Sequence, residues 1–253
     1  MTMKKKLLFI IPLLSAAAAH AETDDAGLWL SAGVEKKISK KAEVGVDVDF
    51  RTRNDFKTVD RWGADIGASY KLTKWLKADA GYSLLYYNRQ EKLTTHTTED
   101  GEFLSYNNWR PGYWSVAHRF NVSLTGSVKF GDFGLSLRER WQYTSRPAKT
   151  TERYDFDNET WEETTVGSKD KHLLRSRLQI EYDKKKATFK PYVNAELYNA
   201  MSLEKVRITA GTDIKLTKHH SFDVFYRCQL TNDKESDNEP NCHYIGAGYT
   251  YKF

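Results

Sequence analysis

The sequence lacks a second long apolar run after its N-terminal region. No later segment approaches the ~18 consecutive apolar residues that a membrane-spanning helix needs. Proline is also scarce, at 5 of 253 residues, and the mean hydropathy is low, at -0.69. Because the bilayer core accepts only helices and closed barrels, any membrane span of this chain must be built from strands.

Aromatic residues, in contrast, are abundant, with 7 Trp, 15 Tyr and 12 Phe. A membrane barrel reconciles this number with the low hydropathy. Half of each strand then faces a polar interior, and aromatic residues gather at the two bilayer interfaces. No break in composition divides the chain, so a single domain is expected.

The chain also lacks a strong excess of positive charge. Its formal net charge is +5, but Lys4, Lys5 and Lys6 lie in a predicted leader, and their removal leaves +2. This near balance of charge predicts no nucleic-acid partner.

The N-terminus predicts a secretory signal peptide over residues 1–21. Three lysines precede the apolar run 7–14, and Ala19-His20-Ala21 is a small-residue cleavage motif. No cysteine follows the cleavage point, so a lipoprotein anchor is not expected. Residues 22–253 remain as the exported domain.

Apolar residues alternate with polar residues along most of the exported domain. In residues 42–51, for example, Val46 and Val48 alternate with Asp47 and Asp49. This period of two is typical of β-strands with one apolar and one polar face. Eleven segments follow the rule: 28–35, 42–51, 61–72, 76–84, 119–129, 133–140, 174–181, 189–197, 206–215, 222–230 and 243–253.

The connections between these segments alternate in length. Short turns lie near Lys40, Lys74, Asp132, Lys185 and Lys218, and longer polar connections lie near Asp55, Thr95, Glu159, Met201 and Ser236. Short periplasmic turns and longer extracellular loops are typical of bacterial outer-membrane barrels. The sequence therefore predicts an all-β fold, a single antiparallel transmembrane β-barrel of about 10 to 12 strands in the cell outer membrane.

The count of eleven segments conflicts with the even strand number that is usual in bacterial single-chain barrels. If the C-terminus is periplasmic, the first segment starts on the extracellular side. Either ten strands close the barrel and the segment at residues 28–35 is atypical, or one further strand escapes detection.

The last segment ends on an aromatic residue, Phe253. A terminal strand leaves an open edge unless it pairs with another strand, and its expected partner is the first segment, which would close the barrel. The ending is similar to the signal that outer-membrane assembly machinery reads. We therefore expect the barrel-assembly machinery as a partner.

Alternation alone does not decide which row faces outwards, because a soluble lipocalin-type barrel has its apolar row inside. Aromatic residues such as Trp62, Tyr70 and Phe120 lie towards segment ends, as in interface girdles. We therefore expect the apolar row to contact outer-membrane lipid. Glu139 falls in that row, and we expect it near an interface or at a bulge, since a charge at the midplane costs about 2 to 4 kcal/mol.

Residues 51–87 carry a family resemblance. The pieces RTRNDFKTVDRW and YKLTKWLKADAGYSLLY, above all VDRW and YKLTKWLK, resemble the outer-membrane barrel family labelled domain of unknown function 2490, of the Bacteroidota type. The likeness extends over residues 27–253. The resemblance implies a fold and a location, and it assigns no activity to any residue.

The inferred inward row contains a set of opposite charges. Early segments contribute carboxylates and middle segments contribute guanidiniums, at Asp47, Asp49, Asp65, Asp79, Arg138, Arg140, Arg175 and Arg177. Because unpaired charges in a narrow lumen are unfavourable, we expect these groups to pair across it and largely plug it. The alternative is a narrow channel for small charged solutes.

Two long connections, residues 88–113 and 144–170, combine aromatic and charged side chains. The second carries Tyr154 and Trp161 close to Asp155. Such a mixture suits contact with a glycan or a protein partner. Strand extensions with solvated tips are the alternative.

Catalysis is not expected, and neither a metal site nor a cofactor is predicted. An outer-membrane lipid-modifying enzyme, the alternative, needs a nucleophile and a base within hydrogen-bond reach near the outer rim. His118 and His172 lie in the outward row, but Ser176 is four residues from His172, ~13 Å along one strand. Residues 155–159 resemble a calcium loop only in part, because the glycine needed at the turn is missing.

The only two cysteines, Cys228 and Cys242, flank the last long connection. In an oxidising compartment this spacing suggests a disulfide that staples the loop. Alternation, however, places Cys228 in the outward row and Cys242 in the inward row, so the bridge requires irregular backbone at Cys242.

Overall fold

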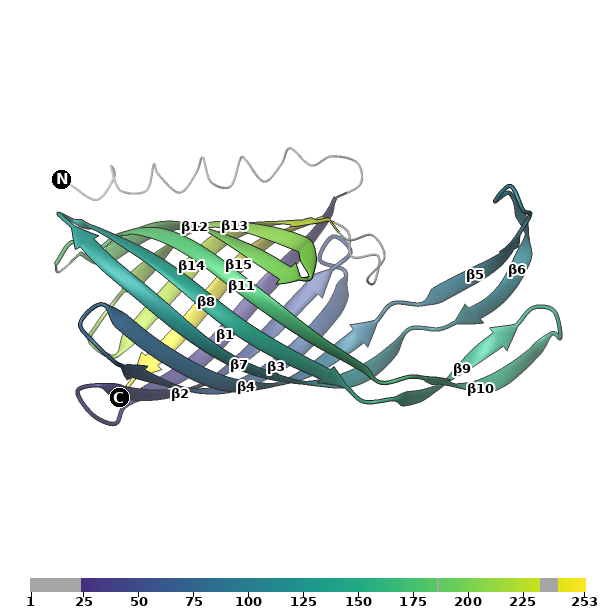
Figure 1. The fold of residues 1–253 in the computed structure, drawn as a ribbon, viewed down its shortest axis with the longest axis horizontal. Coiled ribbons are helices and arrows are strands. Elements are labelled where there is room, and N and C mark those ends of the chain that lie inside the picture. Colours follow the sequence, from purple (N-terminus) through teal and green to yellow (C-terminus); the bar gives the residue numbers. More distant parts are fainter. Residues whose placement is uncertain (1–23, 186, 233–240) are drawn as a thin grey trace.

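Eleven strands close into one barrel in the computed structural model, which describes residues 24–185, 187–232 and 241–253. The barrel strands are β1 (Asp25–Lys37), β2 (Ala42–Arg53), β3 (Thr58–Lys71), β4 (Leu76–Arg89), β7 (Tyr113–Phe130), β8 (Phe133–Arg146), β11 (Lys169–Tyr182), β12 (Phe189–Ala200), β13 (Ser202–Lys215), β14 (His220–Thr231) and β15 (Cys242–Lys252) (Figure 1). No helix in these ranges is long and apolar enough to cross a membrane. The predicted signal peptide lies outside the described residues.

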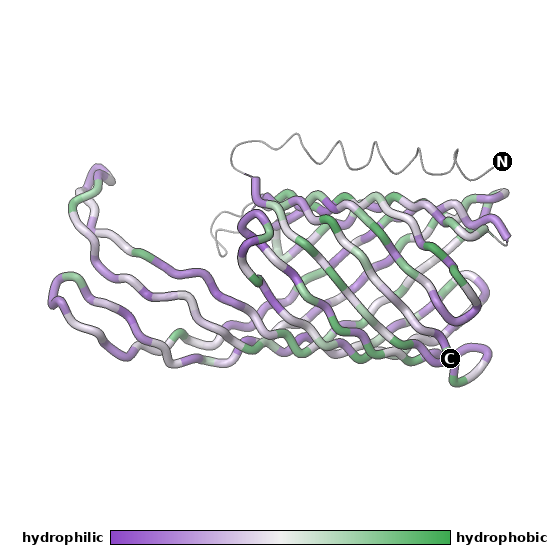
Figure 2. Tube along the Cα trace, turned by 180° about the vertical axis from the view of Figure 1, so that it is seen from behind, coloured by the Kyte–Doolittle hydropathy of each residue, from purple (hydrophilic) through white to green (hydrophobic). Residues whose placement is uncertain are grey.

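The period of two in the sequence sets the two faces of the barrel wall. Apolar side chains point outwards, and Val46, Ile66 and Val122 are each about half exposed. Polar side chains point into the lumen, where Asp49 and Arg61 are both only 6% exposed. Figure 2 shows this alternation as hydrophobic positions spread along every barrel strand. An apolar interior of the lipocalin type is therefore excluded for the described residues.

The first and last strands pair with each other, as expected, but they run parallel. β1 and β15 align from Asp25 opposite Cys242 to Glu35 opposite Lys252, while every other neighbouring pair in the barrel is antiparallel. The count of eleven segments is thus correct, and the described residues contribute no further strand to the barrel. Hairpins reverse direction at each step, so an odd number of strands leaves the first and last pointing the same way.

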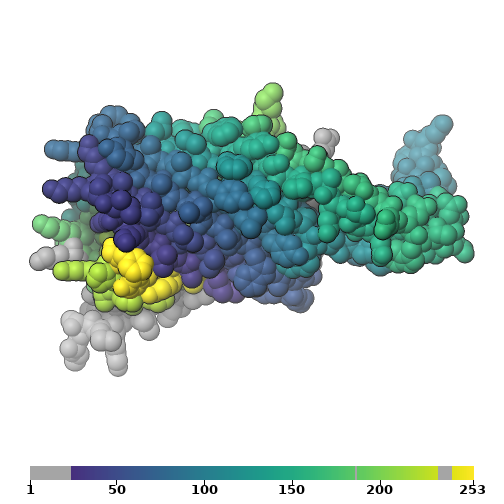
Figure 3. Space-filling view, turned by 90° about the horizontal axis from the view of Figure 1, so that it is seen from below, coloured from purple at the N-terminus to yellow at the C-terminus, as the bar shows by residue number. Residues whose placement is uncertain are grey.

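Two of the long connections are not simple loops. They form a four-stranded sheet from β5 (Lys92–Thr97), β6 (Phe103–Arg110), β9 (Lys149–Asp155) and β10 (Thr160–Val166). This sheet, which we call the arm, projects from one end of the barrel (Figures 1 and 3). We call that end the arm end. The opposite end, with connections 38–41, 72–75, 131–132 and 216–219, is the short-turn end.

Aromatic rings gather on the outside near both ends of the barrel. At the short-turn end, the rings of Phe130 and Phe133 lie 6.4 Å apart. Towards the arm end, Tyr86 stacks on Trp114 at 4.7 Å. The apolar outer surface therefore lies between two aromatic girdles, as the sequence predicts.

Glu139 interrupts this outer surface, but not at a bulge. It is the seventh of the fourteen residues of β8, and the pairing with β7 and β11 continues without a register shift through it. Ser176 Oγ, directly opposite on β11, donates a hydrogen bond to Glu139 Oε2 at 2.6 Å. The expected bulge is absent, and a neighbouring hydroxyl partly satisfies the carboxylate halfway along the strand.

The parallel closure can be tested with paired cysteines. In a Cys228→Ser, Cys242→Ser background, Ala32→Cys with Tyr249→Cys is expected to react with a short bifunctional thiol reagent, because these outward residues are opposite each other. Ala32→Cys with Ile245→Cys is the control, displaced by four residues or about 13 Å along β15. Cross-linking of the control pair alone would contradict the register, and gel mobility after reaction reports it.

Candidate functional site: a ring of side chains in the lumen

Side chains from neighbouring strands form hydrogen bonds with one another inside the barrel. One of these side chains is that of Asp49 on β2. Its Oδ1 accepts hydrogen bonds from Arg51 Nε at 2.9 Å and from an Arg61 terminal nitrogen at 3.0 Å. The period of two puts Asp49 and Arg51 on one face of β2, and Arg61 is the direct partner of Arg51 on β3. One carboxylate therefore holds two guanidiniums, both less than a tenth exposed.

The phenol of Tyr87 on β4 links the side chains of β3 to those of β7. Tyr87 Oη accepts a hydrogen bond from Arg61 at 3.0 Å and another from Arg119 on β7 at 3.0 Å. Arg119 Nε in turn donates to Thr144 Oγ1 on β8 at 3.3 Å. Tyr87 thus separates two positive groups that would otherwise repel each other.

A second carboxylate, Glu196 on β12, organises the opposite side of the lumen. Arg175 on β11 donates to Gln142 Oε1 and to Glu196 Oε2, both at 2.9 Å. Arg138 on β8 reaches the other carboxylate oxygen at 2.5 Å, and Tyr198 Oη donates to Glu196 Oε2 at 2.8 Å. Charge-assisted hydrogen bonds of this kind are among the strongest in proteins.

The indole of Trp29 closes the ring between β1, β2 and β14. The guanidinium of Arg51 lies 3.0 Å from its ring centre, that of Arg227 lies 4.0 Å away, and that of Arg207 lies 5.4 Å away. Arg207 also hydrogen-bonds Tyr198. The negative face of an aromatic ring attracts cations, so Trp29 acts here in place of a carboxylate.

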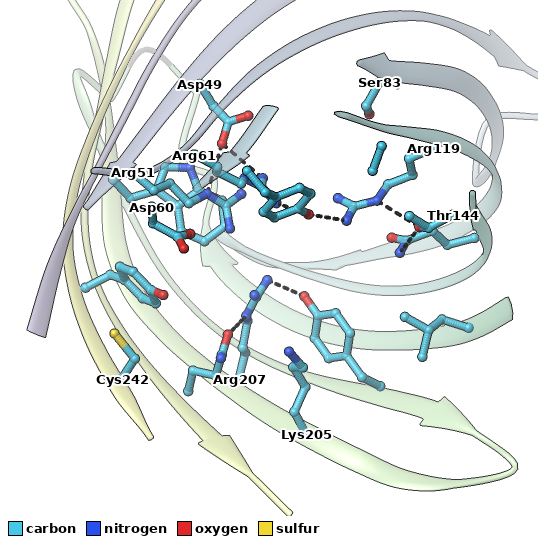
Figure 4. A pocket seen from close by; sticks show the side chains of 18 of the residues that line it. Asp49, Arg51, Asp60, Arg61, Ser83, Arg119, Thr144, Lys205, Arg207 and Cys242 are labelled. Carbon is cyan, nitrogen blue, oxygen red and sulfur yellow. Dashed lines mark hydrogen bonds and ion pairs between the residues drawn. The ribbon is translucent and has the colours of Figure 1, made fainter. Parts of the chain in front are cut away.

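Together these contacts form a continuous ring that includes residues from all eleven strands. Figure 4 shows the part of it around Asp49, Arg61, Arg119 and Arg207. The lumen ring consists of Trp29, Asp49, Arg51, Arg61, Tyr87, Arg119, Gln142, Thr144, Arg175, Glu196, Tyr198, Arg207, Arg227, Gln229 and Tyr244. Tyr244 on β15 joins through its ring, 5.7 Å edge-on from Trp29.

Two cavities adjoin the lumen ring. One, of about 530 Å³, extends towards the arm end, and its described lining includes thirteen Arg and Lys but only seven Asp and Glu. The other, of about 310 Å³, extends towards the short-turn end, where Gly33, Gly45, Gly67 and Gly81 leave space on the β1 to β4 side. Arg140 lines both cavities, so its side chain lies between them.

The eight charged residues predicted for the lumen all lie there, but they do not form one network. Asp65 takes a hydrogen bond from Ser83, and Asp79 pairs with Lys77 at 2.8 Å. Among the described residues, no ion pair joins the predicted carboxylates to the four predicted arginines. The expected pairing across the lumen was wrong because β7 and the cavities separate the two groups.

Several residues of the lumen ring escaped the sequence prediction, including Trp29, Tyr87 and Glu196. All of them lie in the inward row, so alternation places them in the lumen. Their partners, however, depend on strand tilt and register, which the sequence of a single strand does not contain.

The predicted disulfide is absent, and both cysteines are free thiols. Cys242 is buried and lines the cavity at the arm end, whereas Cys228 lies on the outer face, opposite His243 on β15. The prediction was wrong because the β14–β15 pairing stays regular up to Cys242, which leaves the thiols on opposite sides of the sheet.

The outward histidines considered for catalysis lie among aromatic rings. Tyr82 Oη lies 2.7 Å from His118 Nδ1, and the ring of His172 lies 4.8 Å from that of Tyr143. Within the described part of the chain, neither histidine hydrogen-bonds a serine, and Ser176 instead bonds Glu139.

The arm carries an exposed aromatic face. Tyr154 on β9 is the direct partner of Trp109 on β6 and of Trp161 on β10, so the three share one side of the sheet. The ring of Trp161 lies 5.7 Å from that of Trp109 and 5.4 Å from that of Tyr154. A further pair of rings, Tyr106 and Phe156 at 5.5 Å, extends the cluster. Trp161 is 53% exposed.

The turn between β9 and β10 uses the carboxylate that a calcium loop would need. The backbone and side-chain amides of Asn158 and the backbone amide of Asp157 all donate to Asp155. These hydrogen bonds hold the pKa of Asp155 below its ordinary value. The carboxylate therefore stabilises the turn.

A protein-family model matches most of the chain. The model of the family described as Protein of unknown function (DUF2490) matches residues 26–239, which is most of the chain. The chain belongs to this family. The family resemblance seen in the sequence is thereby confirmed.

Two solved structures share the barrel architecture at low sequence identity. The β domain of the Bordetella autotransporter BrkA is 16% identical, with 86% of each chain covered and a TM-score of 0.53. The translocator domain of the autotransporter NalP from Neisseria meningitidis is 8% identical, covering 97% of this chain and 93% of that one, with a TM-score of 0.45. No curated protein matches the sequence. The likeness to the BrkA domain shows the fold alone.

The lumen ring can be perturbed by one methyl group. A Cβ at position 63 would lie 1.8 Å from Asp49 Oδ2, so Gly63→Ala is expected to displace the carboxylate from Arg51 and Arg61. The free energy of unfolding in detergent should fall by about 1 to 3 kcal/mol, since buried charged donors lose their partner. Gly67→Ala on the same face of β3 is the control, because its nearest contact would be 3.5 Å away. Equal stability of the two variants in urea unfolding would contradict the role of Asp49.

Proposed function

We propose that this protein is an integral barrel of the bacterial outer membrane. The observation that carries the proposal is the apolar outer surface, bounded by aromatic girdles, around a polar lumen. A soluble protein rarely exposes so continuous an apolar surface. Lipid contact would bury it, and the closed sheet would leave no barrel edge with unpaired backbone groups in hydrocarbon.

In this orientation the short turns face the periplasm and the arm extends outside the cell. The C-terminal strand then ends at the periplasmic side, where the backbone amide of Phe253 bonds the carbonyl of Glu35 at 2.9 Å. The Phe253 side chain itself is exposed. Its exposure supports recognition of the last strand by the barrel-assembly machinery.

The lumen ring acts as a plug, and the arm acts as a contact surface. A ring that links all eleven strands by hydrogen bonds and cation–π contacts stabilises the barrel and obstructs its middle. The exposed aromatic face of the arm, with Glu152 opposite Glu163 beside it, suits contact with a glycan or a protein. The role is structural and adhesive, without catalysis.

A second candidate function is a narrow channel for small charged solutes. Two observations favour it: the two lumen cavities both reach Arg140, and cations outnumber carboxylates in the described lining of the larger one. Such a channel would prefer anions.

The orientation predicts opposite labelling of two engineered thiols. In the Cys228→Ser, Cys242→Ser background, Glu99→Cys at the tip of the β5–β6 hairpin should react with an impermeant maleimide on intact cells. Lys74→Cys in the β3–β4 turn should react only after the outer membrane is broken. Labelling of Lys74→Cys alone on intact cells would reverse the orientation, and equal labelling of both would argue against a spanning barrel.

Single-channel recording separates plug from channel. The refolded protein in a planar bilayer is expected to show no steady conductance, because the lumen ring fills the middle of the barrel. Tyr87→Ala removes the acceptor shared by Arg61 and Arg119 and should produce intermittent openings, whereas Tyr86→Ala on the outer face should not. A steady, anion-selective conductance of the wild type would replace the plug with the second candidate function.

A further inference from the structure

Four arginines form a block on two adjacent strands, which shares Arg175 with the lumen ring and extends from it towards the short-turn end. Arg140 on β8 is directly opposite Arg175 on β11, and Arg138 is directly opposite Arg177. Like charges placed directly opposite each other destabilise a sheet. Cross-strand pairing alone would therefore not favour four positive charges at this part of the wall, yet the two strands place them there.

One carboxylate serves this block. Glu196 pairs with Arg138 and Arg175, and it also accepts a hydrogen bond from Tyr198. Arg140 and Arg177 have no hydrogen bond or ion pair with any other described residue. The Nε atoms of all four arginines are buried without a hydrogen-bond partner in the described chain. Glu196 neutralises one of the four positive charges, so three of them remain uncompensated within the block.

One of the two unpaired guanidiniums, that of Arg140, has space in front of it. Arg140 lines both cavities, and across that space stand Asp47 and Asp65, which also line both. No ion pair bridges the gap among these residues, so the two walls are further apart than direct contact. A small solute can therefore contact the basic wall without displacing a protein group, and the acidic wall would keep an anion on the β8–β11 side.

The short-turn end would deliver anions to this region. Its mouth is a cavity of about 1000 Å³ lined by eight lysines and a single carboxylate, Glu43. A funnel of one charge sign raises the local concentration of the opposite ion.

We propose that the arginine block binds a small multivalent oxyanion of the phosphate class, with Arg140 as the contact that lines both cavities and Arg177, its diagonal neighbour on β11, as the second cation. Guanidinium is a planar fork that matches phosphate oxygens with two parallel hydrogen bonds. A dianion also neutralises more of the retained charge than a monocarboxylate would. The ligand is either inorganic phosphate or the phosphate group of a small solute that fits the cavity.

The test uses the purified full barrel in detergent micelles, so its outcome does not depend on the membrane location or the orientation proposed above. Urea unfolding is followed by tryptophan fluorescence in sodium phosphate and in sodium chloride of matched ionic strength, over a phosphate titration. The wild type should show a saturable shift of the midpoint. Arg140→Gln with Arg177→Gln should weaken apparent phosphate affinity about tenfold or more, since two charged hydrogen-bond donors are lost.

Lys40→Gln with Lys218→Gln is the charge-matched control, because it removes two positive charges from the mouth at the short-turn end. It should keep the saturable shift. General salt effects of phosphate persist in every variant and give the background. In phosphate-free buffer the double arginine variant should be at least as stable as the wild type, because it relieves repulsion, whereas a purely structural pairing would make it less stable.

Three results would overturn the proposal: no saturable phosphate effect in the wild type, an unchanged effect in the arginine variant, or loss of the effect in the lysine control alone. The last would place binding at the mouth. If the double variant does not refold, Arg140→Gln alone serves, since Arg140 lines both cavities and is outside the lumen ring. Titration of the wild type with glycerol phosphate then distinguishes a phosphate-bearing solute from inorganic phosphate.

Discussion

An odd number of strands joined by hairpins can close only through a parallel pair, and the architecture of this protein depends on that constraint. The β1–β15 pair supplies it over eleven residue positions. Its arm end is secured by the bond from the amide of Asp25 to the carbonyl of Asn241 at 2.9 Å. Because both terminal strands run the same way, Asp25 lies at the arm end and Lys252 at the short-turn end. Closure then leaves the barrel without an edge.

Closure also brings side chains from every strand to one level of the lumen. Each of the two carboxylates in the ring holds two guanidiniums, so carboxylates alone leave an excess of positive charge. Aromatic groups compensate in part: the face of Trp29 lies against three arginines, and the phenol of Tyr87 accepts from two. Arginine suits such contacts because its flat, weakly hydrated group both stacks and hydrogen-bonds. The barrel therefore gains a packed interior without full neutralisation.

The sequence predicted the faces of the wall and the number of segments, because a period of two is a local property that each strand carries by itself. It did not predict which charges pair. Asp49 lies in a row with Asp47, yet only Asp49 meets Arg61, because register places Arg51 opposite Arg61. The same dependence on register applies to Glu139, whose partner Ser176 belongs to another strand. Alternation correctly placed the two cysteines on opposite faces of the sheet, whereas their spacing along the chain suggested a disulfide that does not form.

Different arginines of one wall belong to the lumen ring and to the proposed anion site. Arg175 belongs to the lumen ring through Gln142 and Glu196, whereas Arg177, two residues along the same face, has no hydrogen bond or ion pair with another described residue. An oxyanion held by Arg140 and Arg177 would lie next to Glu196, the carboxylate that already holds Arg138 and Arg175. Repulsion between the ligand and Glu196 would then weaken the segment of the ring that this carboxylate organises. A ligand that enters from the short-turn end would thus act on the plug itself, which makes occupancy of the block and closure of the lumen coupled properties.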